Sequence, residues 1–190
     1  MTEAITPATD YPKRLVILTD ADGRRVALDP QTSALPVIDH PHSKIHAGEM
    51  FTIALSAVLG GGQKLQIALN SGATKWNHVS WSADASMAAT VTIKQEVATL
   101  AGGTTATPQS RNQADPQTPV GTAKTGIPAG PLTFTGGTAL GSPKVIGAGL
   151  ARAGSEWVVK PNVDVVWEIE SSGLPNTVNF EVNFYQEDPS

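Results

Sequence analysis

Cysteine is absent from all 190 residues of the chain. Its absence excludes disulfide bonds, thiolate metal ligands and a cysteine nucleophile. Charged residues are also scarce, at 16%, compared with roughly 25% in an average globular chain. A surface with little charge and many Thr, Ser, Asn and Gln side chains suits close packing against other proteins. We therefore expect stability to come from packing and assembly instead of covalent cross-links.

The sequence has no excess of basic residues and no long apolar run. Lys and Arg number 13 against 17 Asp and Glu, which gives a formal net charge of −4, so binding to nucleic acid through its phosphates is not expected. No stretch approaches the roughly 18 consecutive apolar residues of a membrane span. Residues 1–12 lack the apolar segment of a secretory signal. The sequence predicts a soluble protein, made in a cytoplasm, that binds neither nucleic acid nor membrane.

Helical periodicity is weak, and the dominant pattern is the alternation of a β-strand. Residues 177–185 place apolar side chains at every second position with polar ones between them, so one face of this strand is predicted to be buried. Shorter runs of the same kind occur at residues 65–69, 79–81 and 91–93. The apolar residues of the longest run are Val178, Phe180, Val182 and Phe184.

Turn-forming residues separate these runs. Residues 60–62 are three glycines between two apolar runs, and Lys-Pro-Asn at 160–162 interrupts the run 157–169, so both sites are predicted to be hairpin turns. About nine or ten short strands with turns between them predict an all-β fold. The expected architecture is an antiparallel β-sandwich, and among sandwiches we favour the jelly roll.

Residues 101–143 break the strand pattern. Of these 43 residues, eight are Gly, six are Pro and nine are Thr. Such a segment buries too little apolar surface to fold alone. Two alternatives stay open: a long surface loop with one short strand at residues 132–135, or a segment that becomes ordered on a neighbouring subunit. Shortening residues 104–129 is expected to leave a folded domain. Residues 1–36 are expected to form an N-terminal arm or extra hairpin, and residues 37–190 the sandwich domain.

Three of the four histidines lie at positions 40, 42 and 46. Imidazole and carboxylate groups bind Zn, Fe, Mn or Ni, and His40, His42 and Glu49 resemble the first metal motif of the cupins, which are also jelly rolls. However, Pro41 would disturb a strand that presents both histidines on one face, and no histidine after His78 completes the set. We therefore favour polar residues at a strand entry or contact surface over a metal site, and expect no cofactor.

Other motifs that suggest chemistry are weaker. Glu168 and Glu170 are expected on an exposed strand face, in preference to a pair of glycosidase carboxylates. No nucleophile elbow or catalytic triad is recognisable, so no catalytic residue is predicted. The four tryptophans could line a sugar-binding surface, but each lies in or beside an alternating strand, which favours core positions for two or three of them. They are Trp76, Trp81, Trp157 and Trp167.

Three stretches, taken in order, resemble the head decoration (cement) proteins of tailed bacteriophages. They are His-Ser-Lys-Ile-His-Ala-Gly at 42–48 leading into Met-Phe-Thr, Thr-Lys-Trp-Asn-His-Val at 74–79, and Glu-Trp-Val-Val-Lys-Pro-Asn at 156–162. A final run, Asn-Phe-Tyr-Gln-Glu at 183–187, resembles the closing strand of that family. The resemblance extends over residues 40–187, and residues 1–36 have no counterpart in it.

The resemblance implies a structural function without catalysis. Proteins of this group are jelly-roll or sandwich folds that bind the outside of an icosahedral shell and bridge subunits of the major capsid protein as dimers or trimers. It implies framework roles for His46 and His78, and a location on the capsid exterior of a virion. Three alternatives stay open: a cupin-like metalloenzyme at His40, His42 and Glu49, a phage tail or fibre component, and a carbohydrate-binding module with an exposed tryptophan pair.

Overall fold

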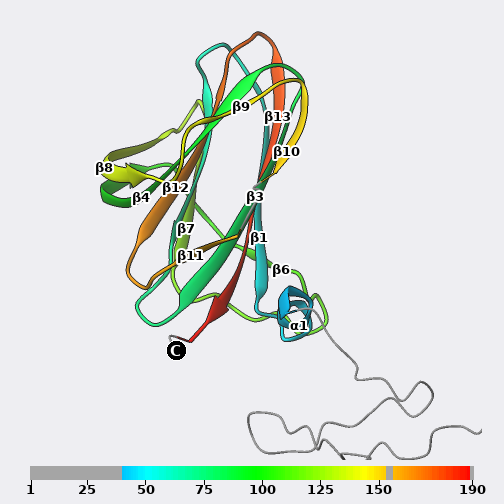
Figure 1. Ribbon diagram of the computed structural model, residues 1–190, viewed down its shortest axis with the longest axis vertical. Helices are drawn as coiled ribbons and strands as arrows, with labels where there is room; N and C mark the ends of the chain where they lie inside the picture. Colours follow the sequence, from blue (N-terminus) through cyan, green and yellow to red (C-terminus); the bar gives the residue numbers. More distant parts are fainter. Residues whose placement is uncertain (1–39, 153–155, 189–190) are drawn as a thin grey trace, which may run out of the picture. The chain divides into compact units, whose positions relative to one another are not determined.

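The computed structural model describes residues 40–152 and 156–188, so the expected N-terminal arm or hairpin at 1–36 lies outside the described residues. Within these ranges the chain forms a short helix, α1 (His40–His46), and two antiparallel β-sheets that pack against each other (Figure 1). The predicted all-β sandwich is confirmed. No helix in the described ranges is long and apolar enough to cross a membrane.

Each sheet is built from strands that are distant in the sequence. The first sheet has the order β10 (Gly149–Arg152), β3 (Trp76–Ala85), β13 (Asn176–Glu187), β1 (Met50–Leu59) and β6 (Gln109–Ser110), with β11 (Trp157–Val159) also paired to β3. The second has the order β5 (Thr104–Ala106), β7 (Thr122–Gly126), β2 (Lys64–Asn70), β12 (Asp164–Ser171), β4 (Ala89–Gly102) and β8 (Leu132–Ala139), with β9 (Lys144–Ile146) also paired to β4.

The connectivity is that of a jelly roll, in which one long antiparallel hairpin is rolled up. Its outermost pair is β1 with β13, and the next pair is β2 with β12. Further in, β3 pairs with β10 and β11, and β4 pairs with β8 and β9. Successive pairs alternate between the two sheets, and the sheets are completed where β13 meets β3 and β12 meets β4. The favoured jelly-roll form therefore fits the strand order.

The core lies between the inner faces of the two sheets. The four apolar residues predicted to be buried in residues 177–185 are 0–1% exposed, so the face assignment of this strand is confirmed. Across the core, Trp167 of β12 is completely buried. Aromatic rings contact each other within the first sheet, since the Phe51 and Phe184 centroids are 5.2 Å apart and the Trp81 and Phe180 centroids are 6.5 Å apart.

The two turns predicted as hairpins instead carry the chain from one sheet to the other. Residues 60–62 connect β1 of the first sheet to β2 of the second, and residues 160–162 connect β11 to β12. A turn does form at residues 160–162, as predicted. Asn162 has a φ of 59°, a conformation that Asn tolerates better than most residues. Local sequence shows that the chain turns, whereas the sheet that receives the next strand depends on packing.

The expectation of a long loop at residues 101–143 is wrong for about half of its length, where strands are formed, and right for residues 111–121. The segment contains the end of β4, all of β5, β6 and β7, and β8, which includes the predicted strand at 132–135 and continues to Ala139. β7 pairs along β2 through five residues. Just before β7, Gly121 has a φ of 99°, and a Cβ there would collide with the carbonyl oxygen of Asn70. β5 and β7 are therefore integrated into the second sheet, and whether residues 104–129 are dispensable for folding stays a matter for experiment.

A second, smaller core lies on the outer face of the second sheet. The ladder between β4 and β8 has a register shift between Val97 and Thr99, and Glu96 has a φ of 58°. A bulge of this kind bends the strand, and Figure 1 shows the paired ends of β4 and β8 projecting to one side of the sandwich. Leu132 is thereby buried with three residues on that face: Ala68, Val97 and Val166.

Candidate functional site

Residues from all the stretches that carry the family resemblance meet at one end of the first sheet, beside α1. We call this group the His78 cluster and define it as Lys44, His78, Glu156, Tyr185 and Glu187. Lys44 lies in α1, His78 in β3, and Tyr185 and Glu187 at the end of β13, while Glu156 immediately precedes β11. The register pairs Tyr185 with His78 across two neighbouring strands. The clustering therefore follows from the strand order.

Both ring nitrogens of His78 face carboxylates. Nδ1 lies 2.6 Å from Oε1 of Glu156, with which it shares a hydrogen bond, and Nε2 lies 3.2 Å from Oε2 of Glu187. The imidazole stacks on the Tyr185 ring, with centroids 4.5 Å apart and an interplanar angle of 12°. The Tyr185 hydroxyl donates a hydrogen bond of 2.9 Å to the same Glu156 oxygen. His78 is thus fixed on two edges and one face.

Lys44 connects the helix to this cluster. Its Nζ lies 2.8 Å from a carboxylate oxygen of Glu49 and 3.9 Å from one of Glu187, and it donates a hydrogen bond of 3.5 Å to the Gln186 carbonyl. The Lys44 side chain is only 20% exposed. A partly buried ion pair is screened less by solvent than an exposed one, so these contacts hold α1 against the end of β13.

The loop between β6 and β7, which we call the passage, is bound by residues at the same end of the sandwich. The buried Gln186 amide donates to Asn77 Oδ1 and to the Val120 carbonyl, both at 2.8 Å, and its oxygen accepts from the Val120 backbone N–H at 2.7 Å. On the other side of the passage, Asn112 donates a hydrogen bond of 2.8 Å to the His46 carbonyl. Hydrogen bonds near both ends of residues 110–120 therefore hold this segment in place beside α1.

The His78 cluster connects several segments of the chain through its polar contacts. Both imidazole nitrogens face carboxylates within the protein. The described residues contain no group of three or more His, Asp or Glu side chains arranged to hold a metal ion. The cluster joins a helix, a loop and two strands that are far apart in the sequence. Its evident effect is to fix the shape of this end of the molecule.

The alternative metal site at His40, His42 and Glu49 requires the two histidines to lie on a strand, but the structure places them on a helix. Residues 40–46 form α1, whereas two histidines one residue apart share a face only on a strand. The side chains of His40 and His42 lie outside the described parts of the chain. The Glu49 carboxylate is engaged by Lys44 at 2.8 Å. The absence of a metal site stays a prediction.

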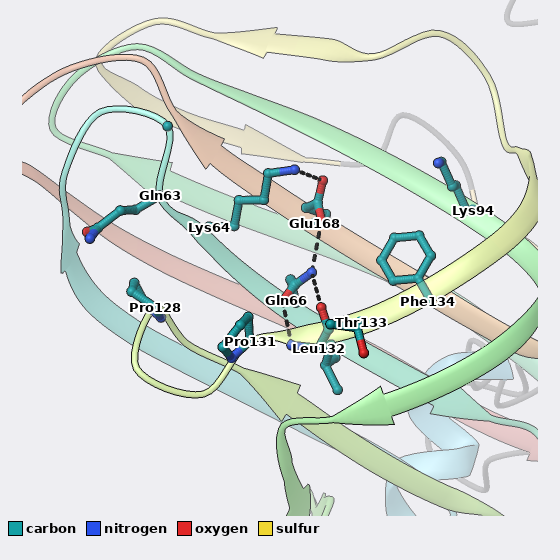
Figure 2. A pocket seen from close by; sticks show the side chains of 11 residues that line it. Gln63, Lys64, Gln66, Lys94, Pro128, Pro131, Leu132, Thr133, Phe134 and Glu168 are labelled. Carbon is teal, nitrogen blue, oxygen red and sulfur yellow. Dashed lines mark hydrogen bonds and ion pairs between the residues drawn. The ribbon is translucent and has the colours of Figure 1, made fainter.

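A shallow hollow of about 580 Å³ lies on the outer face of the second sheet (Figure 2). At its floor the Gln66 side chain binds Leu132 on both sides: its nitrogen donates to the Leu132 carbonyl at 3.1 Å, and its oxygen accepts from the Leu132 N–H at 2.8 Å. The same nitrogen donates to Glu168 at 2.9 Å. This contact, which we call the Gln66 latch, closes β8 onto the sheet.

Two lysines and a glutamate line the hollow, and one of the lysines is paired with carboxylates. Lys64 lies 2.6 Å from a carboxylate oxygen of Glu168 and 3.2 Å from one of Glu170. The hydrogen bond to Glu168 raises the pKa of Lys64 above its usual value, while burial opposes the shift. On the opposite wall, the Lys94 Nζ lies 5.4 Å from the centroid of the Phe134 ring. Glu168 and Glu170 share a strand face, as predicted, and serve as partners of a lysine.

The exposed tryptophan pair that a sugar-binding surface would need is not formed. Trp81 and Trp167 are 4% and 0% exposed and belong to the core. Trp157 is partly buried and packs against the same core. Trp76 is half-buried and lines a separate hollow with His78, Val158 and Glu187. Three of the four rings therefore have packing roles, in agreement with the favoured sequence interpretation.

The outer face of the first sheet carries short polar side chains together with the exposed apolar residues Val58, Leu150 and Val158. The Thr52 hydroxyl donates to Asn183 Oδ1 at 2.6 Å, and the Ser56 hydroxyl donates to Asn179 Oδ1 at 2.7 Å. Ser80 and Ser82 of β3 line shallow hollows on this face together with Glu181. This face offers both hydrogen-bonding groups and apolar side chains to another protein surface.

Neither sequence comparison, with family models and with curated proteins, nor the comparison with solved structures found a match.

Proposed function

We propose that this chain is a structural protein of a virion, a decoration protein that binds the outer surface of a phage capsid and bridges subunits of the major capsid protein. One observation carries the proposal. The stretches that resemble the decoration family are separate in the sequence, but their polar residues converge in the His78 cluster. Convergence of this kind is expected if the resemblance reflects a shared architecture and not chance matches of short motifs.

The surface of the molecule supports a binding role over an enzymatic one. The outer face of the first sheet combines hydrogen-bonded polar side chains with the exposed apolar residues Val58, Leu150 and Val158. In the hollow on the second sheet, Lys64 and Glu168 are paired with each other. In the proposed function each copy contacts two or more capsid subunits, so that many copies together raise the force needed to burst a DNA-filled shell. The same role includes association with other copies as a dimer or trimer, without nucleic acid, membrane or cofactor.

The end of the sandwich beside α1 is the proposed capsid-facing end. There the passage at residues 111–119 is mostly exposed but anchored at both of its ends. An anchored loop loses less conformational entropy on binding than a free one, and so binds more tightly for the same contact area. The His78 cluster would act as a positioning device that holds α1 and this passage in the orientation required for binding.

Co-sedimentation with capsids tests the function directly. Capsids are assembled from the major capsid protein encoded in the same genome, without decoration protein, and are mixed with the full chain. We expect saturable binding at a fixed ratio to capsid subunits and a higher temperature of shell rupture. Binding to isolated tails but not to capsids would favour the tail-component alternative. Absence of binding to both mature and immature shells would contradict the proposal.

A further inference from the structure

Among the residues that the structure describes, the first sheet has a long open edge along β1. On one side β1 is paired with β13 over its whole length, from Met50 to Leu59, without a register shift. On the other side β6 pairs only with Phe51 and Thr52. From Ile53 to Leu59 no described strand borders this second side. In the sheet order β10-β3-β13-β1-β6, the last strand is only two residues long and leaves most of this side of β1 uncovered.

Strand geometry identifies the backbone groups that this edge leaves unpaired. The Met50 carbonyl accepts a hydrogen bond of 2.8 Å from the Arg111 N–H beside β6, so the backbone groups of Met50 point to the open side. Because these directions alternate along a strand, those of Ala54, Ser56 and Val58 point there too. All three residues are exposed, Val58 by 65%.

The edge lacks the features with which soluble proteins protect exposed strands. Natural edges carry lysines, prolines or bulges, or are very short. β1 has ten residues, Met-Phe-Thr-Ile-Ala-Leu-Ser-Ala-Val-Leu, and none of them is charged or proline. On its inner side, Leu55 and Ala57 pack against the core but are only partly buried. An edge of this kind is a template for another strand.

We propose that β1 pairs antiparallel with β1 of a second copy of this chain, across a two-fold axis at Ser56. In this register Ser56 faces Ser56 of the second copy, and Ala54 faces Val58. It joins all three edge-facing residues in pairs that exchange two backbone hydrogen bonds each. Shifting the centre by one residue leaves one of the three without an edge-facing partner, because Thr52 is already paired with Gln109.

The side chains favour a second copy as the occupant because β1 is complementary to itself in this register. On the outer face the small Ala54 lies opposite the larger Val58, and two serine hydroxyls meet at the axis. On the inner face Leu55 lies opposite Ala57, so each copy covers apolar surface that the other leaves half-exposed. No charges meet, since β1 has none. The contacts of one strand pair are fewer than those of a standard interface of about 1,200–2,000 Å², so the dimer should dissociate on dilution.

Single cysteines test both the pairing and its register, because the chain has no cysteine of its own. In a hydrogen-bonded antiparallel pair the Cα atoms are roughly 5.5 Å apart, within the roughly 4.4–6.8 Å that a disulfide spans. The Ser56→Cys variant should therefore form disulfide-linked dimers on mild oxidation. Ala54→Cys and Val58→Cys alone should not, since each lies about 13 Å from its own counterpart, but their mixture should give the linked heterodimer.

Sedimentation of the full chain provides the second measurement. We expect the wild-type protein to reach twice its 19.8 kDa mass at sub-millimolar concentration. Ser56→Pro should stay at the monomer mass with an unchanged β-sheet spectrum, because the lost N–H points away from β13. Thr177→Lys, on the same outer face but one strand further in, should dimerise normally. Equal cross-linking by all three cysteine variants, a monomeric wild type, or an oligomer that Ser56→Pro leaves intact would overturn the proposal, which does not depend on capsid binding.

Discussion

Phe180 shows how a single ring on β13 contributes to stability. It is 1% exposed, and it meets Trp81 edge-on with centroids 6.5 Å apart. Phe180→Ala should lower the free energy of unfolding by about 3–5 kcal/mol, since it removes buried apolar surface and leaves a cavity. Urea denaturation of dilute protein measures the change. Asn179→Ala, on the exposed side of the same strand, is the matched control and should change stability by less than about 1 kcal/mol. The opposite ranking would contradict the face assignment.

Gln66 has a different role, because its side chain replaces a partner strand for one residue of β8. In Gln66→Ala the N–H and C=O of Leu132 lose their partners, and an unsatisfied buried polar group costs about 1–3 kcal/mol. We expect a loss of that size in urea denaturation, and faster hydrogen exchange at the Leu132 amide in particular. Gln63→Ala, which removes an exposed side chain bound to Gly60, should leave the Leu132 amide protected. Unchanged exchange in Gln66→Ala would rule out the latch.

At the residue scale the sequence predicts burial well and polar partnerships poorly. The alternation over residues 177–185 assigns Val178 and Phe184 to the core, because burial on a strand depends on side-chain order alone. By contrast, His78, Glu156 and Glu187 come from three separate segments, and nothing near any one of them indicates the other two. The order of the family-like stretches was the one signal that pointed to them jointly. Nothing in the sequence indicates the Gln66 latch, because the alternating pattern of residues 65–69 places Gln66 at an ordinary polar position of a strand.

At the scale of elements, changes in the segment between β6 and β7 should weaken capsid binding without affecting folding. Replacing residues 113–118 by a Gly-Ser sequence of equal length should keep the β-sheet spectrum and the urea midpoint close to wild type, because these residues lie outside every strand. The same variant should bind undecorated capsids more weakly in the co-sedimentation assay, since the proposed contact surface is lost.

The control for this prediction is a larger deletion. Replacing residues 104–129 by a short turn removes β5, β6 and β7 and uncovers the edge of β2, so we expect that variant to unfold. Normal capsid binding by the 113–118 variant would move the contact to another face of the sandwich. A folded 104–129 deletion would show that β7 contributes little to the second sheet.

The strands β7 and β8 could not be predicted fully from the sequence, for a physical reason. β7, Thr-Ala-Lys-Thr-Gly, has no apolar alternation, and β8 contains two consecutive glycines. Both form because they pair with strong strands, β2 and β4, and because Leu132 finds a cluster on the outer face of the sheet. The glycines at residues 60–62 illustrate a related limit: they indicate a turn, but they do not indicate which of the two sheets the next strand joins. Pairing partners are tertiary information.

For the whole molecule, the strand order determines when during synthesis the fold can form. β1 and β13 are the outermost pair of the rolled hairpin, and Thr52 and Asn183, which bond across them, are separated by 131 residues. The ribosome must synthesise and release the chain through β13 before β1 can meet its partner. Closing so long a loop is entropically expensive and slows folding. Until then β1, uncharged and open on both sides, is a nascent segment that depends on chaperones or on rapid completion of the chain to avoid pairing with its neighbours on the same polysome.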